Sequence, residues 1–221
     1  MAVMNDVQVD TVRIPAESAT LVGDLARPDH AHGLVVFAHG SGSSRLSPRN
    51  RAVASALQEA GFATLLLDLL TLAEERTDVL SGGYRFDIMF LARRLVAAID
   101  WAHRTPGTLN LPIGLFGAST GAAAALVAAA ERPALVRAVV SRGGRPDLAW
   151  DALGEVEAPT LLIVGGSDTP VIQLNQEAAR LLRCVHETVL VPGASHLFEE
   201  AGTLEKVTAL ATSWFEKYLV K

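Results

Sequence analysis

The chain has 221 residues, half of them hydrophobic, and its 19 basic and 24 acidic side chains give a net charge of −5. This length can bury a core without disulfides, and the absence of any long basic cluster argues against a nucleic-acid partner. The sequence shows no signal peptide and no apolar run long enough to span a membrane, and its one cysteine, Cys184, cannot form an internal disulfide. We therefore expect a cytoplasmic protein that acts on a small molecule.

Apolar runs and helical patterns alternate along the chain. Residues 7–14 and 19–28 predict two strands that pair antiparallel at a sheet edge. Further buried strands are predicted at residues 33–38, 62–68, 111–116, 136–142, 159–165 and 186–192. Helices are predicted at residues 47–60, 84–104, 120–131, 171–182 and 203–218, with a polar loop over residues 68–83. This order predicts one α/β domain over residues 1–221, with a mostly parallel sheet, an antiparallel N-terminal hairpin and helices on both faces.

In such sheets, ligands bind beyond the carboxyl ends of the strands. One of these positions carries Gly117-Ala118-Ser119-Thr120-Gly121, a G-x-S-x-G pattern between a predicted strand and a predicted helix. A serine at so sharp a turn takes an unfavourable backbone conformation, and glycines on either side remove collisions with the neighbouring helix and strand. The pattern predicts that Ser119 is a nucleophile, and the alternative is a tight turn that contains a hydroxyl.

A nucleophilic serine needs a base, which an acid in turn orients. Of the two histidines downstream, His186 starts a strand at the wrong edge of the sheet, whereas His196 lies in a loop at the correct edge. For the acid, the sequence favours Asp168, which follows a strand directly. Asp147 and Asp151, one strand earlier, are the alternatives, and Asp168 could also be a simple helix cap.

The negative charge that develops during acyl transfer needs two backbone N–H donors, which form an oxyanion hole. One should come from Thr120, at the start of the predicted helix. The other should come from the loop after residues 33–38, where Gly40 and Ser41 are both candidates and we favour Ser41. His39 is interpreted as a structural residue of this loop.

With these residues in place, the chain resembles the α/β-hydrolases, and most of all the branch related to dienelactone hydrolase. The resemblance runs nearly end to end through VVFAHGSGSS, LFGASTGAA, VVSRGG, TLLIVGGSD and VPGASHLFEE. It implies a Ser119–Asp168–His196 triad and an ester or related acyl substrate. Dienelactone hydrolases proper resemble this chain but carry cysteine where Ser119 stands, so the resemblance favours carboxylesterase-like serine chemistry.

Arg142 follows a predicted strand at the same edge as the triad, and a guanidinium can bind a substrate carboxylate through two parallel hydrogen bonds. The alternative is that Arg142 and Arg145 form surface ion pairs with nearby acidic residues. Residues 143–158 are too few for a cap domain, so we expect an open site, roofed at most by residues 68–83. A short, carboxylate-bearing ester is the expected substrate, with long-chain lipids excluded.

The same residues suggest other functions as alternatives. A dinucleotide-binding loop would need a third glycine after Gly40 and Gly42, but Arg45 stands there. A non-catalytic scaffold that acts as a binding protein, and dienelactone or C–C bond hydrolysis or acyl transfer on the same triad, remain open. No group of residues has metal-ligand spacing, so we expect neither metal nor cofactor, and no membrane partner. A homodimer is a further possibility.

Overall fold

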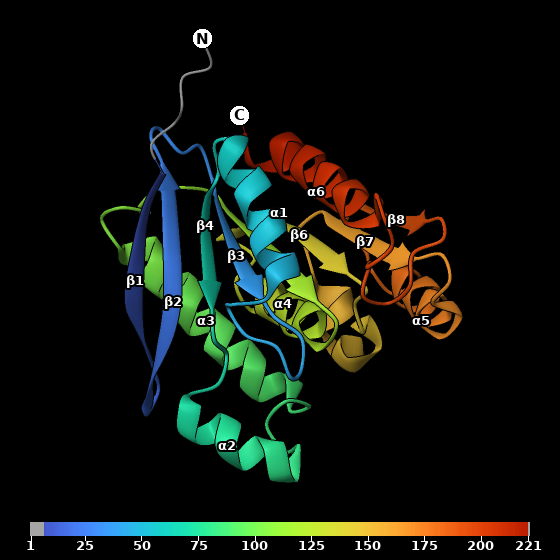
Figure 1. Ribbon diagram of the computed structural model, residues 1–221, viewed down its shortest axis with the longest axis horizontal. Coiled ribbons are helices and arrows are strands. Elements are labelled where there is room, and N and C mark those ends of the chain that lie inside the picture. The colour runs from blue at the N-terminus through green and yellow to red at the C-terminus, as the bar shows by residue number, and fades with distance from the viewer. Residues whose placement is uncertain (1–6, 221) are drawn as a thin grey trace.

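The computed structural model describes residues 7–220 and contains an eight-stranded sheet in the order β1-β2-β4-β3-β5-β6-β7-β8 (Figure 1). The strands are β1 (Val7–Ala16), β2 (Ala19–Pro28), β3 (Leu34–Ala38), β4 (Ala63–Leu67), β5 (Ile113–Ala118), β6 (Val136–Arg142), β7 (Thr160–Gly165) and β8 (His186–Val191). β1 pairs antiparallel with β2, and β2 antiparallel with β4, while the remaining neighbours are parallel. The predicted parallel sheet with an antiparallel hairpin at its edge is confirmed.

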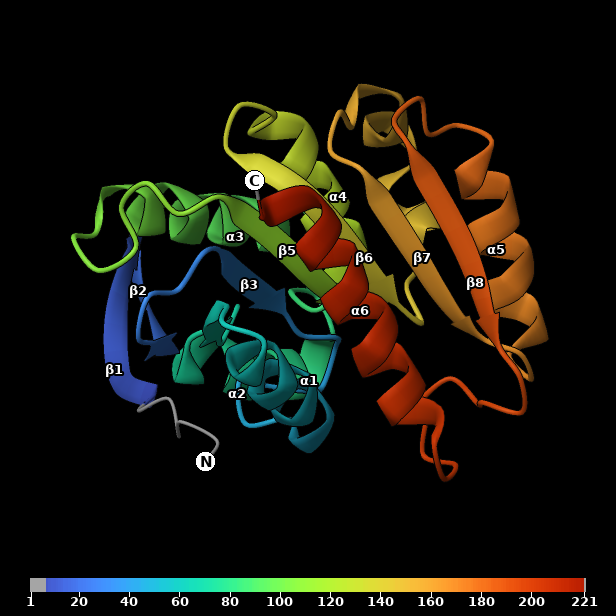
Figure 2. The same cartoon turned by 90° about the horizontal axis from the view of Figure 1, so that it is seen from above.

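Helices cover both faces of the sheet (Figure 2). They are α1 (Pro48–Glu59), α2 (Leu72–Ser81), α3 (Ile88–Arg104), α4 (Thr120–Glu131), the 3₁₀-helix η1 (Pro146–Glu155), α5 (Thr169–Ala179) and α6 (Thr203–Leu219). The apolar side chains of α1 and α6 form one core with the sheet, and those of α3, α4 and α5 form the other. Every residue of β3, β4 and β5 is buried, as their continuous apolar runs predict.

The prediction of a loop over residues 68–83 is wrong, because helix α2 occupies most of it. Thr71 and Glu74 form a reciprocal capping box at its start. Glu74 also accepts a hydrogen bond from Arg94 of α3, at 2.7 Å. The helix buries the polar side chain of Asp78 and leaves Leu80 exposed at 91%, so its sequence lacks the apolar stripe that identifies a surface helix. Figure 1 shows α2 extending below the carboxyl end of β4.

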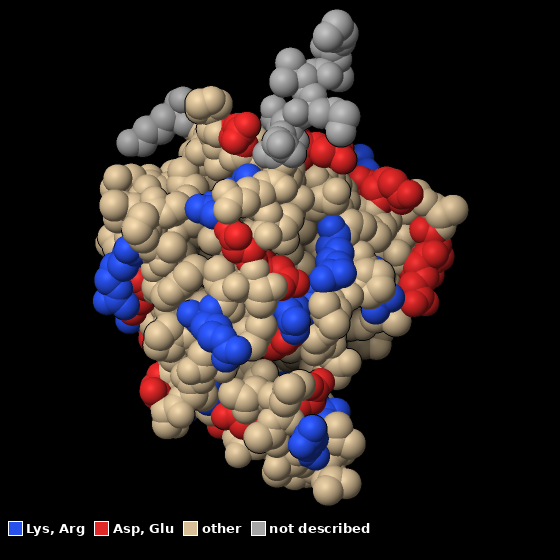
Figure 3. Space-filling view, turned by 60° about the vertical axis from the view of Figure 1, so that its left-hand side comes forward, with Lys and Arg blue, Asp and Glu red and all other residues tan. Residues whose placement is uncertain are grey.

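The surface is mixed in charge. Figure 3 shows basic and acidic side chains interspersed over the face that carries β1 and β2, and ion pairs such as Arg27–Asp10 link some of them. Among residues 7–220, no helix has the length and apolar character of a membrane span.

Candidate active site

Ser119 lies at the junction of β5 and α4 in a strained backbone conformation, with φ 51° and ψ −122°. A non-glycine residue rarely adopts a positive φ, and surrounding packing must hold it there. That packing is tight on both sides. A Cβ on Gly117 would lie 2.4 Å from Ala122 Cα, and one on Gly121 would lie 2.3 Å from the Ala38 carbonyl oxygen. The two glycines therefore have the steric role that their spacing predicts.

His196, in the loop after β8, is bonded to Asp168 at the start of α5. Asp168 Oδ2 lies 2.7 Å from His196 Nδ1, and the Asp168 side chain makes no cap hydrogen bond to its own helix. The alternative acid Asp147 instead accepts two hydrogen bonds from Arg145, both at 2.8 Å. A carboxylate on Nδ1 selects the tautomer with its proton on that nitrogen, which leaves Nε2 as an acceptor.

The end of β6 brings the serine and the histidine to the same place. The Ser119 backbone N–H donates to the Arg142 carbonyl oxygen at 3.2 Å. The next residue is Gly143, where a Cβ would lie 3.6 Å from His196 Cε1. We call the tight turn at Ser119 the elbow. The backbone of the elbow and the His196 imidazole thus both adjoin the carboxyl end of β6.

The loop that follows β3, residues 39–44, passes directly beside Ser119, and we call it the oxyanion loop after the role that the sequence predicts for it. A Cβ on Gly40 would lie 3.0 Å from Ser119 Cβ, so only a bare backbone comes this close. The His39 ring is buried and makes two hydrogen bonds. Its Nδ1 lies 2.9 Å from the Gly40 carbonyl oxygen, and its Nε2 accepts the Leu69 N–H at 3.0 Å. Burial lowers the pKa of His39 and outweighs the opposing effects of the Gly40 carbonyl and Asp68. A neutral His39 therefore joins the oxyanion loop to the connection between β4 and α2.

The predicted oxyanion-hole residues lie together, with a hydrogen bond that the sequence did not predict. The Ser41 N–H donates to Thr120 Oγ1 at 2.9 Å. Thr120 is the first residue of α4, where backbone N–H groups have no helical acceptor. Ser41 and Thr120 are far apart in the chain, and no local pattern indicates their contact.

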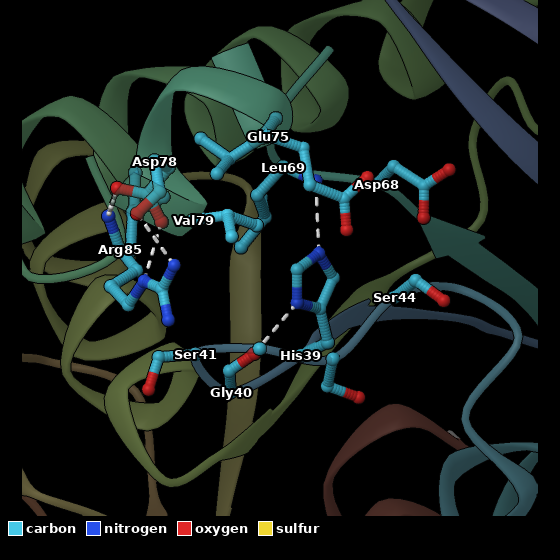
Figure 4. Close-up of a pocket in the computed structure, with 14 residues that line it drawn as sticks. His39, Gly40, Ser41, Ser44, Asp68, Leu69, Glu75, Asp78, Val79 and Arg85 are labelled. Carbon is cyan, nitrogen blue, oxygen red and sulfur yellow. Dashed lines mark hydrogen bonds and ion pairs between the residues drawn. The ribbon is translucent and has the colours of Figure 1, made fainter. Parts of the chain in front are cut away.

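A cavity of about 160 Å³ separates the oxyanion loop from α2 (Figure 4). Its lining includes the backbone of the oxyanion loop, the apolar side chains of Leu69 and Val79, and the charged pair Asp78–Arg85. Figure 4 shows His39 and this charged pair on opposite sides of the cavity. Helix α2, rather than a loop, is therefore the element over this side of the site. Within residues 7–220, no three His, Cys, Asp or Glu side chains are grouped to hold a metal ion.

Arg142 is a buried cation, 8% exposed, and no acidic side chain within residues 7–220 forms an ion pair with it. Its Nη2 donates to Asn50 Oδ1 at 3.4 Å, its Nε and Nη1 have no partner, and its guanidinium carbon lies 5.9 Å from the centre of the Phe198 ring. Burial, with a smaller contribution from the Arg49 charge, lowers the pKa of Arg142 to about 10. The surface ion pair weighed as an alternative is formed by Arg145 and not by Arg142. Arg142 does not line the cavity of Figure 4.

Cys184 and His186 lie away from this cluster. Cys184 is in the turn before β8, where its Sγ lies 3.8 Å from Thr160 Oγ1, and burial raises the pKa of its thiol. His186 opens β8 and bonds to the Cys184 carbonyl oxygen. Both are at the amino ends of β7 and β8, the opposite edge of the sheet from Ser119.

Known proteins match this chain over nearly all its length. The dienelactone hydrolase family model matches residues 21–219. The crystal structure of a dienelactone hydrolase from Anabaena variabilis is 57% identical with a TM-score of 0.95, covering 96% of this chain and 99% of that one. Est1E from Butyrivibrio proteoclasticus is 17% identical with a TM-score of 0.77, covering 94% of this chain and 98% of that one, and shares the fold.

Curated relatives from two strains of Mycobacterium tuberculosis are provisionally named phosphoribosyl transferases. Each is 56% identical over 210 residues, which make up 95% of this chain and 46% of the relative. The chain thus spans about half the length of the curated relatives it matches. The family match and the structural match together place the chain in the dienelactone hydrolase family, with its α/β-hydrolase fold.

Proposed function

We propose that this chain is a serine hydrolase that cleaves small esters through an acyl-enzyme, with Ser119 as nucleophile, His196 as base and Asp168 as the orienting acid. Membership of a hydrolase family supports the reaction class. The observation that carries the assignment is the 2.7 Å bond between His196 and Asp168, together with the strained backbone of Ser119, which is bonded to the strand end that adjoins His196. The chain order here is nucleophile, acid, base, which is the order typical of α/β-hydrolases.

In the proposed mechanism, His196 Nε2 takes the hydroxyl proton as Ser119 Oγ attacks the ester carbonyl carbon. The resulting oxyanion accepts hydrogen bonds from the Thr120 and Ser41 backbone N–H groups. The imidazolium then donates its proton to the leaving alkoxy oxygen, and the C–O bond breaks to leave an acyl-enzyme. Water then attacks the acyl carbon as His196 takes its proton, and the imidazolium returns that proton to Ser119 Oγ as the bond between Oγ and the acyl carbon breaks and the acid is released. Asp168 fixes the imidazole tautomer throughout.

The proposed substrate is a short ester that carries a carboxylate. A buried, unpaired charge is costly, and an anion that enters beside Arg142 would satisfy donors that have no partner among residues 7–220. The cavity of about 160 Å³ beside the oxyanion loop is lined by none of Ser119, Asp168 or His196, so the support for an anionic substrate comes from Arg142.

Lactone hydrolysis at the same residues is a second candidate, because the Anabaena protein that is 57% identical is named a dienelactone hydrolase. A lactone is an ester, so the mechanism is unchanged except that the leaving oxygen stays attached to the acyl group. We do not extend phosphoribosyl transfer to this chain. The matched segment is only 46% of the relatives with that name, and it is the segment that carries the elbow serine.

The test is hydrolysis of p-nitrophenyl butyrate by Ser119→Ala. Loss of the nucleophile should lower kcat by several orders of magnitude, on the order of 10³-fold or more. Ser213→Ala, an exposed serine on α6, serves as the matched control and should keep wild-type activity. If Ser119→Ala keeps a tenth of the wild-type rate while remaining folded, Ser119 is not the nucleophile and the proposal is wrong.

A further inference from the structure

A side chain of α4 is bonded to the oxyanion loop. Thr120 is 3% exposed, and its Oγ1 accepts the Ser41 N–H at 2.9 Å. On its other side the same loop is held by His39, which accepts the Leu69 N–H. Gly40 lies between these two attachments and Gly42 follows Ser41, and Gly42 has a φ of 69° with no neighbouring atoms within 4 Å of an added Cβ. A glycine-rich segment of this kind has little conformational preference of its own.

We propose that the Thr120 hydroxyl is a positioning group for the oxyanion hole: it holds the Ser41 N–H beside the Thr120 N–H. This inference rests on the proposed function. Oxyanion donors act because they are fixed at about 2.7–3.1 Å from the developing charge before the reaction begins. Thr120 is well placed to fix one, because it is anchored at the first position of a helix whose next residue packs on the end of β3.

The bond does not remove Ser41 from the reaction. One N–H can be shared between two acceptors in a three-centre hydrogen bond. The Thr120 hydroxyl also keeps its own proton, which it can donate while Oγ1 accepts from Ser41. Thr120 follows Ser119 directly and holds the Ser41 N–H. The position of the oxyanion hole is therefore coupled to the position of Ser119.

The opposite role for the same bond would be to occupy the Ser41 N–H until substrate displaces the hydroxyl. That role requires the Thr120 side chain to swing away. Thr120 is buried and β-branched, and the second feature restricts its χ1 rotation. The two roles predict opposite signs when the hydroxyl is removed: positioning predicts slower turnover, and blocking predicts faster turnover.

The experiment compares Thr120→Val, which keeps the shape and removes the acceptor, with Thr120→Ser, which keeps the hydroxyl. With p-nitrophenyl butyrate, Thr120→Val should lower kcat by about 10- to 100-fold with little change in KM, approaching the effect of losing one oxyanion donor. Thr120→Ser should stay within about threefold of wild type, because serine retains the hydroxyl oxygen that accepts the Ser41 N–H. The inhibition constant of butylboronic acid, whose tetrahedral adduct mimics the oxyanion, should rise with Thr120→Val in parallel with the loss of kcat.

Thr160→Val is the matched control. It removes another fully buried hydroxyl, which donates to the Ala158 carbonyl oxygen at 2.9 Å, at the far edge of the sheet. Its kcat should match wild type. Thermal melting of each variant checks folding, and Thr120→Ala replaces Thr120→Val if the valine variant does not fold.

An unchanged or faster Thr120→Val enzyme would overturn the positioning role, as would a Thr120→Ser enzyme as slow as Thr120→Val. Ser119→Ala separates this outcome from failure of the proposed function. An inactive Ser119→Ala with a fully active Thr120→Val rejects the role of Thr120 alone, whereas an active Ser119→Ala rejects the serine mechanism itself.

Discussion

The Ser119 N–H donates to the carbonyl oxygen of Arg142 at 3.2 Å, so the elbow serine and the buried arginine are held at the ends of two adjacent parallel strands. The elbow is thereby fixed to a central part of the sheet. The residue after Arg142 lies against His196 and brings the imidazole to the same edge. The same end of the sheet supports three of the proposed functional groups at once, so a loop histidine and an aspartate at the start of a helix can be positioned together.

Asp168→Asn should depress kcat strongly, because an amide at this position no longer fixes the imidazole tautomer. The loss can approach the ~10⁴-fold seen for a protease triad. Asp147→Asn is the comparison, since Asp147 is bonded to Arg145 and should leave kcat nearly unchanged. Steady-state hydrolysis of p-nitrophenyl butyrate measures both. If Asp168→Asn leaves kcat nearly unchanged and Asp147→Asn lowers it strongly, Asp147 is the acid.

Arg142→Met should weaken selection for anionic esters. Removing a charged hydrogen-bond donor should lower kcat/KM for a hemisuccinate ester by roughly 10- to 100-fold relative to a butyrate ester. Arg145→Met is the matched control, because Arg145 is already paired with Asp147. The quantity to measure is the hemisuccinate-to-butyrate ratio of kcat/KM, with a palmitate ester as a third substrate. An unchanged ratio in Arg142→Met, or preference for palmitate, rejects the carboxylate-bearing substrate.

Gly40→Ala should inactivate the enzyme with limited loss of folding. The added Cβ would lie 3.0 Å from Ser119 Cβ and 3.1 Å from the Ala118 carbonyl oxygen, so the nucleophile or the oxyanion loop must shift. A shift of about 1 Å at a reacting group can lower the rate about 10²-fold. At Gly42 an added Cβ meets nothing within 4 Å, so Gly42→Ala strains only its own backbone and should lose less activity. Equal activity of the Gly40 variant and wild type would show that the loop is not held against Ser119.

His39 should make the protein less stable as the pH falls below 6.5. Burial lowers the pKa of folded His39 from the ordinary value of 6.5, so below that pH the unfolded chain binds a proton that the folded chain does not. The contribution of His39 to the free energy of unfolding is therefore fully present above pH 6.5. This contribution is lost as the pH falls toward the lower pKa of folded His39.

His39→Gln should flatten this pH dependence, whereas His186→Gln, at an exposed site, should leave it unchanged. Urea unfolding at a series of pH values provides the slopes. If the free energy of unfolding of His39→Gln falls with pH below 6.5 as steeply as that of wild type, His39 does not contribute to the loss of stability in acid.

The sequence predicts the elbow and the sheet well because both depend on local patterns. Two glycines around Ser119 are needed for steric reasons that any chain must satisfy, and fully buried strands such as β3 have continuous apolar runs. Asp168 and His196 could be placed at one edge because parallel strands end together there. Which aspartate faces the histidine depends on loop paths, so Asp147 and Asp151 had to remain alternatives.

Two features could not be predicted from local sequence. Helix α2 has exposed Leu80 and buried Asp78, the reverse of the usual helix pattern, and Asp78 is satisfied by donors from Tyr84 and Arg85 that follow the helix. The bond between Ser41 and Thr120 joins distant segments and depends on how β3 packs against α4. Its only sequence signal is that a hydroxyl residue follows the nucleophile, which is compatible with many other roles.

The most direct test of Ser119 as the nucleophile is covalent labelling with a fluorophosphonate, followed by mass spectrometry of the digested protein. The serine mechanism predicts a single adduct, on Ser119, in the wild-type chain. Labelling should disappear in Ser119→Ala and slow strongly in His196→Ala, because the hydroxyl then lacks its base. No adduct on the folded wild-type protein, or an adduct at a residue other than Ser119, would contradict it.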